Sequence, residues 1–350
     1  MNAYGIILAG GNGERFWPLS TFDRPKQFVD IFEGKPLIRH AADRLKGVIP
    51  PERTFVITAE RFVAMTREAL PMVPPANIIA EPCRRDTAAA VAVAVGLVKK
   101  IGGPDAVGCV LTADHMMKPV TAFRQALKDA IVAATKTDAV ITMGVVPDAP
   151  ETGYGYIKVG SPLDLGTKSV FCNVNGFVEK PDLATARKYF SSGKYYWNSG
   201  MFIWRASIME QAFADHAPDI GKLIDAIAKT RNVGMTLAHT YASIRSVSVD
   251  FAVMEHLERI LVARCTFGWN DVGNWLSLPD LFSRDDSGNT CLGKAVLMDS
   301  NNSIVVAEES RPVVVLGLDH VVVVQTENGT LVCAKNRVQD IKKIVNSGSL

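Results

Sequence analysis

Apolar runs and amphipathic segments alternate along the first 146 residues of the chain. The continuous apolar runs predict buried strands at residues 4–10, 53–59, 77–81, 106–115 and 139–146. Apolar positions at helical spacing predict helices at residues 36–48, 61–70, 86–101 and 121–136, with Asp86 or Thr87 as the N-cap of the third. This alternation indicates an α/β fold in which helices cover both faces of a parallel sheet.

The pattern changes after this region. Residues 153–160 and 173–181 predict strands that close over the sheet, and further helices are expected at residues 182–193, 206–218 and 219–230. From Cys291 the apolar runs are short and rich in valine, with turn residues between them and a possible terminal helix at residues 336–345. We therefore expect two domains, at residues 1–285 and 286–350, of which the second is small and β-rich.

Composition narrows the classes of partner. The chain has 350 residues, of which 48% are hydrophobic, and 38 Lys and Arg balance 36 Asp and Glu to a net charge of +2. Such a chain can bury a sizeable core, but it lacks the strong positive field of a nucleic-acid or membrane binder. Any anion site must be local.

The spacing of the cysteines and the length of the apolar runs predict where the protein is located. None of the six cysteines has disulfide-framework or zinc spacing, so we expect reduced, mostly buried thiols. The N-terminus has no basic region followed by a long apolar stretch, and no apolar run approaches the roughly 20 residues of a membrane span. A soluble, cytoplasmic protein is expected.

The first predicted strand runs into a glycine-rich loop that contains Gly10, Gly11 and Gly13. Without a Cβ, main-chain N–H groups can approach a phosphate closely. The loop is neither a dinucleotide fingerprint, which needs a glycine where Phe16 stands, nor a P-loop, because Glu14 follows the last glycine. A tight turn without a ligand is the alternative.

Two cations follow the glycines. Arg15 offers a planar fork for phosphate oxygens, and Lys26 offers a compact point charge. Pro18 and Pro25 stiffen the segment between them, which lowers the entropy lost on binding. The alternative is an ordinary solvated loop.

The stretch LAGGNGERFWPLSTFDRPKQF resembles the signature of sugar-1-phosphate nucleotidylyltransferases, in particular the mannose-1-phosphate guanylyltransferase branch. Later motifs resemble the same family in the same order: EPCRRDTAAAVAVA, LTADH, GYGYIKVG, FVEKP, WNSGMFIW, SVDFAVME and WNDVGNW. The resemblance covers residues 5 to about 345. It implies a Rossmann-like nucleotidyltransferase domain with a mixed, mostly parallel central sheet, and a short C-terminal domain of the left-handed β-helix type.

The resemblance also implies a reaction. GTP and mannose 1-phosphate would give GDP-mannose and pyrophosphate by in-line attack on the α-phosphorus. Such a transfer needs charge neutralisation and alignment rather than a protein nucleophile. By resemblance, Arg15 and Lys26 are the catalytic cations, and Asp114 and Asp271 hold Mg²⁺; read alone, each aspartate would be a cap or turn residue.

The same resemblance assigns the binding residues. Those expected at the nucleotide are Leu8, Ala9, Gly10, Gly11, Gly13, Glu81, Arg85 and Thr87. Those expected at the sugar phosphate are Gly155, Glu179, Lys180 and Asn198, with Asp250 and Glu255 as possible support. Each has a structural alternative. Glu179 and Lys180 could form a turn before Pro181, Asn198 could lie in a core strand, and Asp250 and Glu255 could belong to a capped surface helix.

One departure and several alternatives stay open. Asp86 stands where the family has asparagine, so nucleotide preference could differ. The same chemistry with another nucleotide or sugar 1-phosphate, a catalytically silent GDP-sugar-binding homologue, and an NAD-dependent oxidoreductase are the rivals. The valine runs of the C-terminal part would be covered by the catalytic domain or by a second subunit, and we expect a homodimer.

Overall fold

The computed structural model describes residues 1–11 and 13–347. Within them the chain forms two compact units, which are described separately. The first consists of Met1–Gly10, Ile38–Ala113 and Met117–Trp269; the second consists of Gly11–Leu37, Asp114–Met116 and Asn270–Leu350. The last three residues of the predicted C-terminal domain, 348–350, lie outside the described part.

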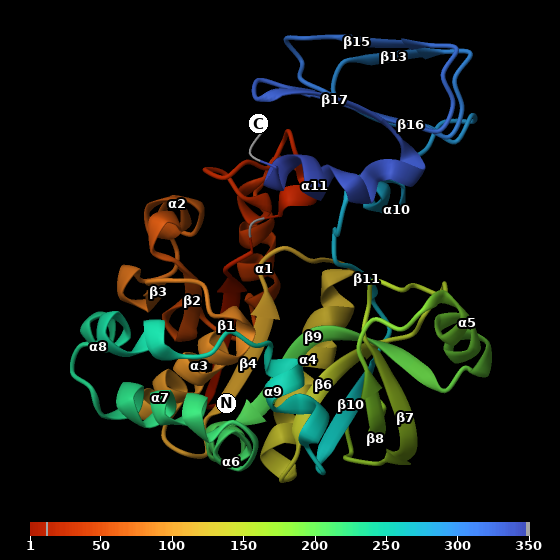
Figure 1. Cartoon of the computed structure of the whole chain (residues 1–350). Coiled ribbons are helices and arrows are strands. Elements are labelled where there is room, and N and C mark those ends of the chain that lie inside the picture. Colours follow the sequence, from red (N-terminus) through yellow and green to blue (C-terminus); the bar gives the residue numbers. More distant parts are fainter. Residues whose placement is uncertain (12, 348–350) are drawn as a thin grey trace. The chain divides into compact units, whose positions relative to one another are not determined.

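The first unit is built on a mixed sheet of nine strands, as counted over the described residues, in the order β3-β2-β1-β4-β9-β6-β10-β8-β7 (Figure 1). The strands are β1 (Ala3–Ala9), β2 (Thr54–Ala59), β3 (Ile78–Glu81), β4 (Val107–Thr112), β6 (Val140–Val145), β7 (Tyr156–Leu163), β8 (Phe171–Val178), β9 (Tyr195–Arg205) and β10 (Ile260–Cys265). Two short strands, β5 (Met116–Lys118) and β11 (Gly268–Asn270), form a separate pair.

Strand direction differs between the two ends of the sheet. β3, β2, β1 and β4 are parallel neighbours, as the alternating pattern predicts. β9 lies between β4 and β6 and is antiparallel to both. β7 and β8, expected to close over the sheet, follow β10 in the strand order, with β8 antiparallel to β10 and β7 antiparallel to β8. β7 also pairs with β9, so these two strands turn back onto the sheet. The mixed α/β class is therefore confirmed.

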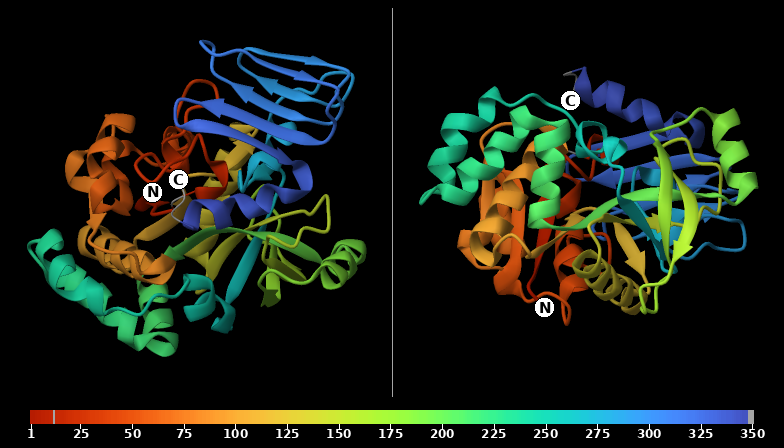
Figure 2. Two further views of the ribbon diagram at one scale, coloured as in Figure 1. Left: turned by 45° about the horizontal axis from the view of Figure 1, so that its top comes forward. Right: turned by 90° about the horizontal axis from the view of Figure 1, so that it is seen from below.

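Helices cover both faces of this sheet. The helices of the first unit are α1 (Leu37–Leu45), α2 (Val63–Ala69), α3 (Asp86–Gly102), α4 (Val120–Lys136), α5 (Leu183–Ser192), α6 (Ala206–His216), α7 (Pro218–Lys229), α8 (Val233–Thr240) and α9 (Val249–Ala252). α3, α6 and α7 pack together on one face, and α4 lies on the other (Figure 2).

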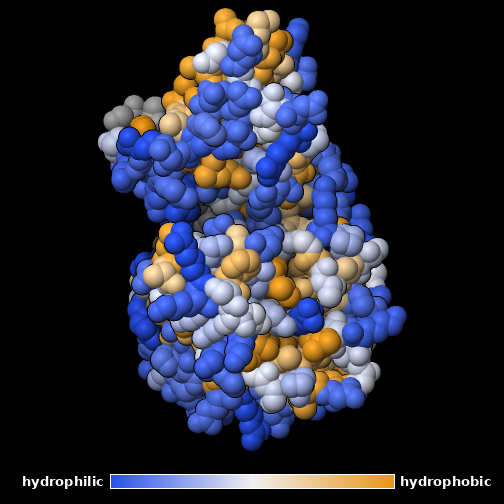
Figure 3. Space-filling model, turned by 90° about the vertical axis from the view of Figure 1, so that its right-hand side faces the viewer, coloured by the Kyte–Doolittle hydropathy of each residue, from blue (hydrophilic) through white to orange (hydrophobic). Residues whose placement is uncertain are grey.

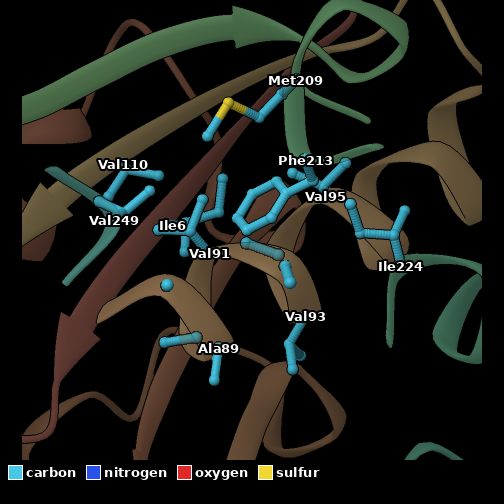
Figure 4. Packing of buried hydrophobic residues seen from close by; sticks show 14 of the residues in the cluster. Ile6, Ala89, Val91, Val93, Val95, Val110, Met209, Phe213, Ile224 and Val249 are labelled. Atoms are coloured by element: carbon cyan, nitrogen blue, oxygen red, sulfur yellow. The ribbon is translucent and has the colours of Figure 1, made fainter. Parts of the chain in front are cut away.

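The central helix α3 explains this packing. Its residues from Ala88 to Val98 are small or β-branched and buried, so neighbouring helices and strands can approach it closely. Figure 4 shows Val91 and Val95 of this helix in one cluster with Ile6, Phe213 and Ile224. The predicted N-cap was wrong: α3 begins at Asp86, and Arg85 occupies the cap position without a side-chain cap hydrogen bond. A capping carboxylate accepts from an N–H two or three residues ahead, whereas that of Asp86 accepts from the adjacent Thr87 N–H at 2.7 Å.

The second unit contains the β-rich C-terminal strands. These are β12 (Thr290–Leu292), β13 (Ala295–Met298), β14 (Ile304–Ala307), β15 (Val313–Leu316), β16 (Val321–Thr326) and β17 (Gly329–Ala334), followed by α11 (Ile341–Asn346) and preceded by α10 (Leu278–Leu281). β12, β14 and β16 are parallel neighbours, and β13 and β15 form a second parallel pair, as in a coiled β-helix (Figure 1). β17 closes a hairpin with β16.

Apolar side chains stay on the surface of this β-rich region, where Figure 3 shows them in orange. Val296, Met298, Val314 and Leu316 are 53–69% exposed, and they face outward from the β13–β15 pair.

The core of the second unit also includes the segment after the glycine loop. Phe16, Phe32 and Leu37 are buried in one cluster with Val322, Val324 and other C-terminal residues. The centroids of the Phe16 and Trp275 rings lie 4.8 Å apart, and the Trp275 indole N–H donates to the Trp17 carbonyl at 3.1 Å. The early segment therefore folds together with residues that follow it by about 250 positions.

No helix in residues 1–11 and 13–347 is long and apolar enough to cross a membrane. The six cysteines, all in the described part, are free thiols. Cys109, Cys172 and Cys265 are buried, and Cys291 is exposed.

Candidate active site

The glycine loop begins where β1 ends. Gly13 has a φ of 64°, and a Cβ there would stand 2.1 Å from the Cβ of Lys26. No side chain fits that space, and the left-handed conformation favours glycine as well. Gly13 therefore lets the chain pass directly over Lys26.

Lys26 lies at the centre of a small charged cluster in the second unit. It begins a short 3-10 helix, Lys26–Phe28, and its side chain is only 7% exposed. Its ammonium contacts Asp114 Oδ2 at 2.8 Å and the main-chain oxygen of Asp271 at 2.6 Å. An ammonium has three donors, so one remains for a further acceptor.

The two aspartates of this cluster are held in different ways. Burial raises the pKa of Asp114, but the charges of Lys26 and His115 outweigh it and leave that pKa below its ordinary value. The carboxylate of Asp271 lies against Gly273, where a Cβ would come within 2.9 Å of Oδ2. The next residue, Val272, is buried with a φ of 49°, a strained conformation for a β-branched side chain of the kind found at functional sites.

The residues present suit a divalent cation of the magnesium type. Among the described residues no group of three or more His, Cys, Asp or Glu side chains is placed to hold a metal. Mg²⁺, however, commonly binds one or two carboxylates and completes its shell with water and substrate phosphates. Lys26 brings Asp114 and Asp271 together, and an ionised Asp114 supplies the hard oxygen that such an ion requires.

Arg15 belongs to the same unit and lies in a 3-10 helix, Glu14–Phe16, directly after Gly13. Its side chain is exposed, and no described residue pairs with it. Gly11 also lies in this unit, and a Cβ there would meet nothing within 4 Å. The second unit thus holds both predicted catalytic cations and both predicted metal ligands.

The remaining predicted nucleotide residues lie in the first unit. Leu8 and Ala9 end β1 and Glu81 ends β3, at the carboxyl edge where open α/β sheets bind ligands. Glu81 Oε2 lies 3.2 Å from the point where a Cβ on Gly10 would stand. Leu8, Ala9, Gly10 and Glu81 are therefore brought to one edge of the sheet.

Arg85 and Thr87 lie at the start of α3 and bind one segment. The Arg85 guanidinium donates to the Ala242 carbonyl. The Thr87 hydroxyl accepts from the Val249 N–H at 2.9 Å. Sequence reasoning missed Tyr241 of the same segment, whose hydroxyl donates to Glu81. No local motif could reveal a pair that is 160 positions apart.

The predicted sugar-phosphate residues also gather in the first unit. Glu179 pairs with Lys180 at 2.8 Å, and its other oxygen fills the space that a Gly155 Cβ would need, at 2.5 Å. The main-chain N–H of Asn198, on β9, donates to the Gly155 carbonyl at 2.8 Å, and the Asn198 side chain donates to Asp250 at 2.8 Å. The four predicted residues are thus joined, and Asp250 is part of the group.

The negative charge of Glu179 affects the protonation of the neighbouring carboxyl groups Asp250 and Glu255. Burial raises the pKa of Asp250 to about 6, the Asn198 hydrogen bond opposes this rise, and the neighbouring Glu179 adds to it. Burial also raises the pKa of Glu255, and again Glu179 contributes. The exposed Lys180 has a φ of 44°, a sparsely populated backbone conformation for a lysine.

Known proteins match both the architecture and the motifs. Residues 4–288 match the Nucleotidyl transferase family, and residues 293–347 match the MannoseP isomerase/GMP-like beta-helix domain. Mannose-1-phosphate guanylyltransferase of Escherichia coli K12 is 38% identical over 350 residues, which are 98% of this chain and 72% of that protein. Mannose-1-phosphate guanylyltransferase 2 of Escherichia coli O157:H7 is 36% identical over 97% of this chain and 72% of its own length. The chain belongs to the mannose-1-phosphate guanylyltransferase family.

A solved structure agrees with this membership. Mannose-1-phosphate geranyltransferase from Thermus thermophilus is 34% identical, with a TM-score of 0.88 and 99% of each chain covered. The resemblance found in the sequence is thereby confirmed, as is a nucleotidyltransferase fold with a β-rich C-terminal domain. The division at residues 285 and 286 and the left-handed sense of the β-helix stay predictions.

Proposed function

We propose that this member of the mannose-1-phosphate guanylyltransferase family transfers GMP from GTP to α-D-mannose 1-phosphate and releases pyrophosphate. The observation that carries the proposal is the Lys26 cluster, in which one enclosed ammonium joins Asp114 to Asp271 next to the glycine loop. The substrates follow from the names of the relatives at 36–38% identity over nearly the whole chain.

The cations act on phosphate charge. The remaining donor of Lys26 contacts the α-phosphate, where negative charge rearranges during in-line displacement. The exposed Arg15 fork neutralises the β- and γ-phosphates and stabilises the departing pyrophosphate. The main-chain N–H groups of Gly11 and Gly13 line the same polyphosphate.

Mg²⁺ is the proposed cofactor, with Asp114 and Asp271 as its protein ligands. When bound, it neutralises phosphate charge and aligns the two anionic substrates. Asp114 is ionised without the ion because Lys26 and His115 lower its pKa against the effect of burial, so no proton has to leave before binding.

We assign the remaining predicted residues to the organic parts of the substrates. Leu8, Ala9, Gly10, Glu81, Arg85 and Thr87 bind the nucleotide. Lys180 binds the phosphate of the sugar, and Gly155 leaves room for the ring. Glu179 accepts hydrogen bonds from the sugar hydroxyls, and Asn198 also hydrogen-bonds the sugar.

The direct test is a substrate panel. Pyrophosphate release would be measured with GTP, ATP, UTP and dTTP against mannose 1-phosphate and glucose 1-phosphate, with and without Mg²⁺. The proposal expects GTP with mannose 1-phosphate to give the highest kcat/KM and expects Mg²⁺ to be required. A higher kcat/KM with another pair would show that the enzyme uses a different nucleotide or sugar 1-phosphate. No turnover with any pair would contradict enzymatic function.

The proposal includes a cytoplasmic homodimer with domains at residues 1–285 and 286–350. The exposed apolar side chains of the β13–β15 pair support association, since large exposed apolar patches usually mark interaction sites. Light scattering of the purified chain would give the mass: 37.9 kDa for a monomer and twice that for the dimer.

A further inference from the structure

Tyr241 is a buried tyrosine that contacts Glu81, one of the predicted nucleotide-binding residues. We propose that Tyr241 is a positioning residue that fixes the Glu81 carboxylate beside Gly10, where that carboxylate selects guanine among the bases. This inference rests on the proposed function and deepens it, because it concerns which base the same site accepts.

The first step is the placement of Tyr241. It begins a 3-10 helix, Tyr241–Ser243, and its side chain is fully buried in the core that contains α3. Its hydroxyl donates to Glu81 Oε1. A second tie joins the same two segments, because Arg85 donates to the Ala242 carbonyl. The Tyr241 segment and the β3–α3 connection are therefore held together at two points.

The second step concerns the other oxygen of Glu81. With Oε1 bound to Tyr241, Oε2 lies 3.2 Å from the position of a Cβ on Gly10, at the edge of the glycine loop. The carboxylate is thus fixed in orientation and faces bare main chain instead of a packed side chain. Burial raises the pKa of Glu81 overall, and the Tyr241 hydrogen bond opposes part of this rise, so the tyrosine favours the ionised form.

The third step is the chemistry of the bases. Guanine carries adjacent N1–H and N2–H donors, and a carboxylate can accept from both. Adenine presents an acceptor at N1, and uracil and thymine offer a single N–H between two carbonyls. A site whose acceptor would be left unpaired rejects such analogues strongly. A carboxylate held in one orientation by Tyr241 therefore favours guanine.

The test uses binding, so that it does not depend on turnover. Titration calorimetry on the intact chain would give Kd for GTP, for ITP, which lacks the 2-amino group, and for ATP. The matched variants are Tyr241→Phe and Tyr4→Phe, which each remove one hydroxyl from a buried tyrosine of the same core. We expect Tyr241→Phe to lower the ratio of Kd for ITP to Kd for GTP by about five- to tenfold, and Tyr4→Phe to leave it unchanged.

A double-mutant cycle separates positioning from packing. In the Glu81→Ala background, Tyr241→Phe should not change the base preference further, because the group that it positions is gone. Glu81→Gln, at a partly exposed position, provides the test should Tyr241→Phe fail to fold: an amide donor facing N1–H and N2–H should abolish the preference for GTP over ITP. An unchanged preference in Tyr241→Phe, or in Glu81→Gln, overturns the inference.

The proposed function can fail separately. A wild-type chain that binds GTP better than ITP, but releases no pyrophosphate with mannose 1-phosphate, would contradict the proposed reaction and leave the role of Tyr241 supported. A wild-type chain that binds GTP and ITP equally well would overturn the inference, whatever the reaction.

Discussion

An ammonium group as enclosed as that of Lys26 needs compensation, because desolvation of a charge is costly unless it is paired. Asp114 supplies a charge and Asp271 supplies a carbonyl, both within hydrogen-bond distance. The position of the ammonium depends on the backbone above it, since Gly13 leaves no room for any side chain. Gly13 is thus as important for the proposed chemistry as the lysine that it covers.

Gly13→Ala should therefore remove activity. Its Cβ would collide with the Cβ of Lys26, and a displacement of about 1 Å costs roughly 100-fold in rate. Gly34→Ala is the matched control, because Gly34 has a φ of 65° against 64° at Gly13, but a Cβ added at Gly34 would have no neighbour within 4 Å. Steady-state pyrophosphate release would measure both variants.

The control should lose only the stability that its backbone conformation costs, about 1–2 kcal/mol, and retain its turnover. Equal activity of the two alanine variants would show that the contact between Gly13 and Lys26 is not needed.

Asp250 makes a residue-scale prediction about pH. Its folded pKa of about 6, raised mainly by burial, lies above the ordinary value of 3.8. The folded state therefore binds this proton more tightly than the unfolded chain does. The resulting stabilisation is complete below pH 4 and is lost as pH rises through about 6.

Asp250→Asn carries no charge at any pH, so its melting temperature relative to wild type should rise between pH 4 and pH 7. Asp182→Asn should show little change across this range, because hydrogen bonds from Thr185 lower the pKa of the Asp182 carboxyl below 3.8, and the resulting stabilisation is lost only at lower pH. Thermal unfolding of both variants across this range measures the difference. A pH-independent difference for Asp250→Asn would contradict the assigned charge state.

At the scale of elements, the turn between β16 and β17 supports the glycine-loop segment. Thr326 and Asn328 donate to the Pro18 carbonyl at 3.3 and 3.2 Å, and Gly329 lies against the Trp17 ring. These residues hold the segment that carries Arg15 and Lys26. The β-rich region therefore helps to hold the loop that carries the proposed catalytic cations.

Asn328→Ala should lower kcat several-fold while the chain still folds, because one hydrogen bond contributes only about 1 kcal/mol. Asn301→Ala, which removes an amide contact to Asp319 in the same β-rich region, serves as control. Steady-state kinetics combined with melting temperature separates the two effects. If both variants lose activity only in proportion to stability, the turn has no positioning role.

Local patterns predicted the elements well and their partners poorly. The helices α1, α3, α4, α6 and α7 and the strands β1 to β4 follow from periodicity that only neighbouring residues determine. The insertion of β9 between β4 and β6 does not, because strand order depends on contacts between distant segments. The cap of α3 was mispredicted because residue type alone does not show which N–H a carboxylate will bind, and that of Asp86 accepts from its neighbour Thr87.

The candidate site shows the same division. The types of residue at Arg15, Lys26, Asp114 and Asp271 could be read from the motifs, whose order matches the family. That Lys26 is enclosed by the two aspartates could not, because they are 88 and 245 positions away. The Tyr241–Glu81 contact could not be predicted either, because Tyr241 lies in none of the motifs that resemble the family.

At the scale of the whole molecule, the chain has separate cores in its two units. Val95 is fully buried in the first, on α3, and Val324 is fully buried in the second, on β16. The core of Val324 includes Phe16, from the glycine-loop segment. Local opening of the second unit should therefore expose that segment as well.

Val324→Ala, at a cost of about 2 kcal/mol, should speed hydrogen exchange in residues 14–29 together with the C-terminal strands. Val95→Ala should speed it mainly in α3, α6 and α7, because these helices share its core. Hydrogen–deuterium exchange with mass spectrometry distinguishes the two patterns. Acceleration of residues 14–29 only by Val95→Ala would contradict the division of the cores.

The most direct measurement for the account as a whole is the rate of GDP-mannose formation from GTP, mannose 1-phosphate and Mg²⁺ by wild type and by Asp271→Ala. We expect turnover for wild type and at least a roughly 100-fold loss for the variant, with an unchanged circular-dichroism spectrum. Near-normal turnover by Asp271→Ala would contradict the site centred on Lys26, Asp114 and Asp271.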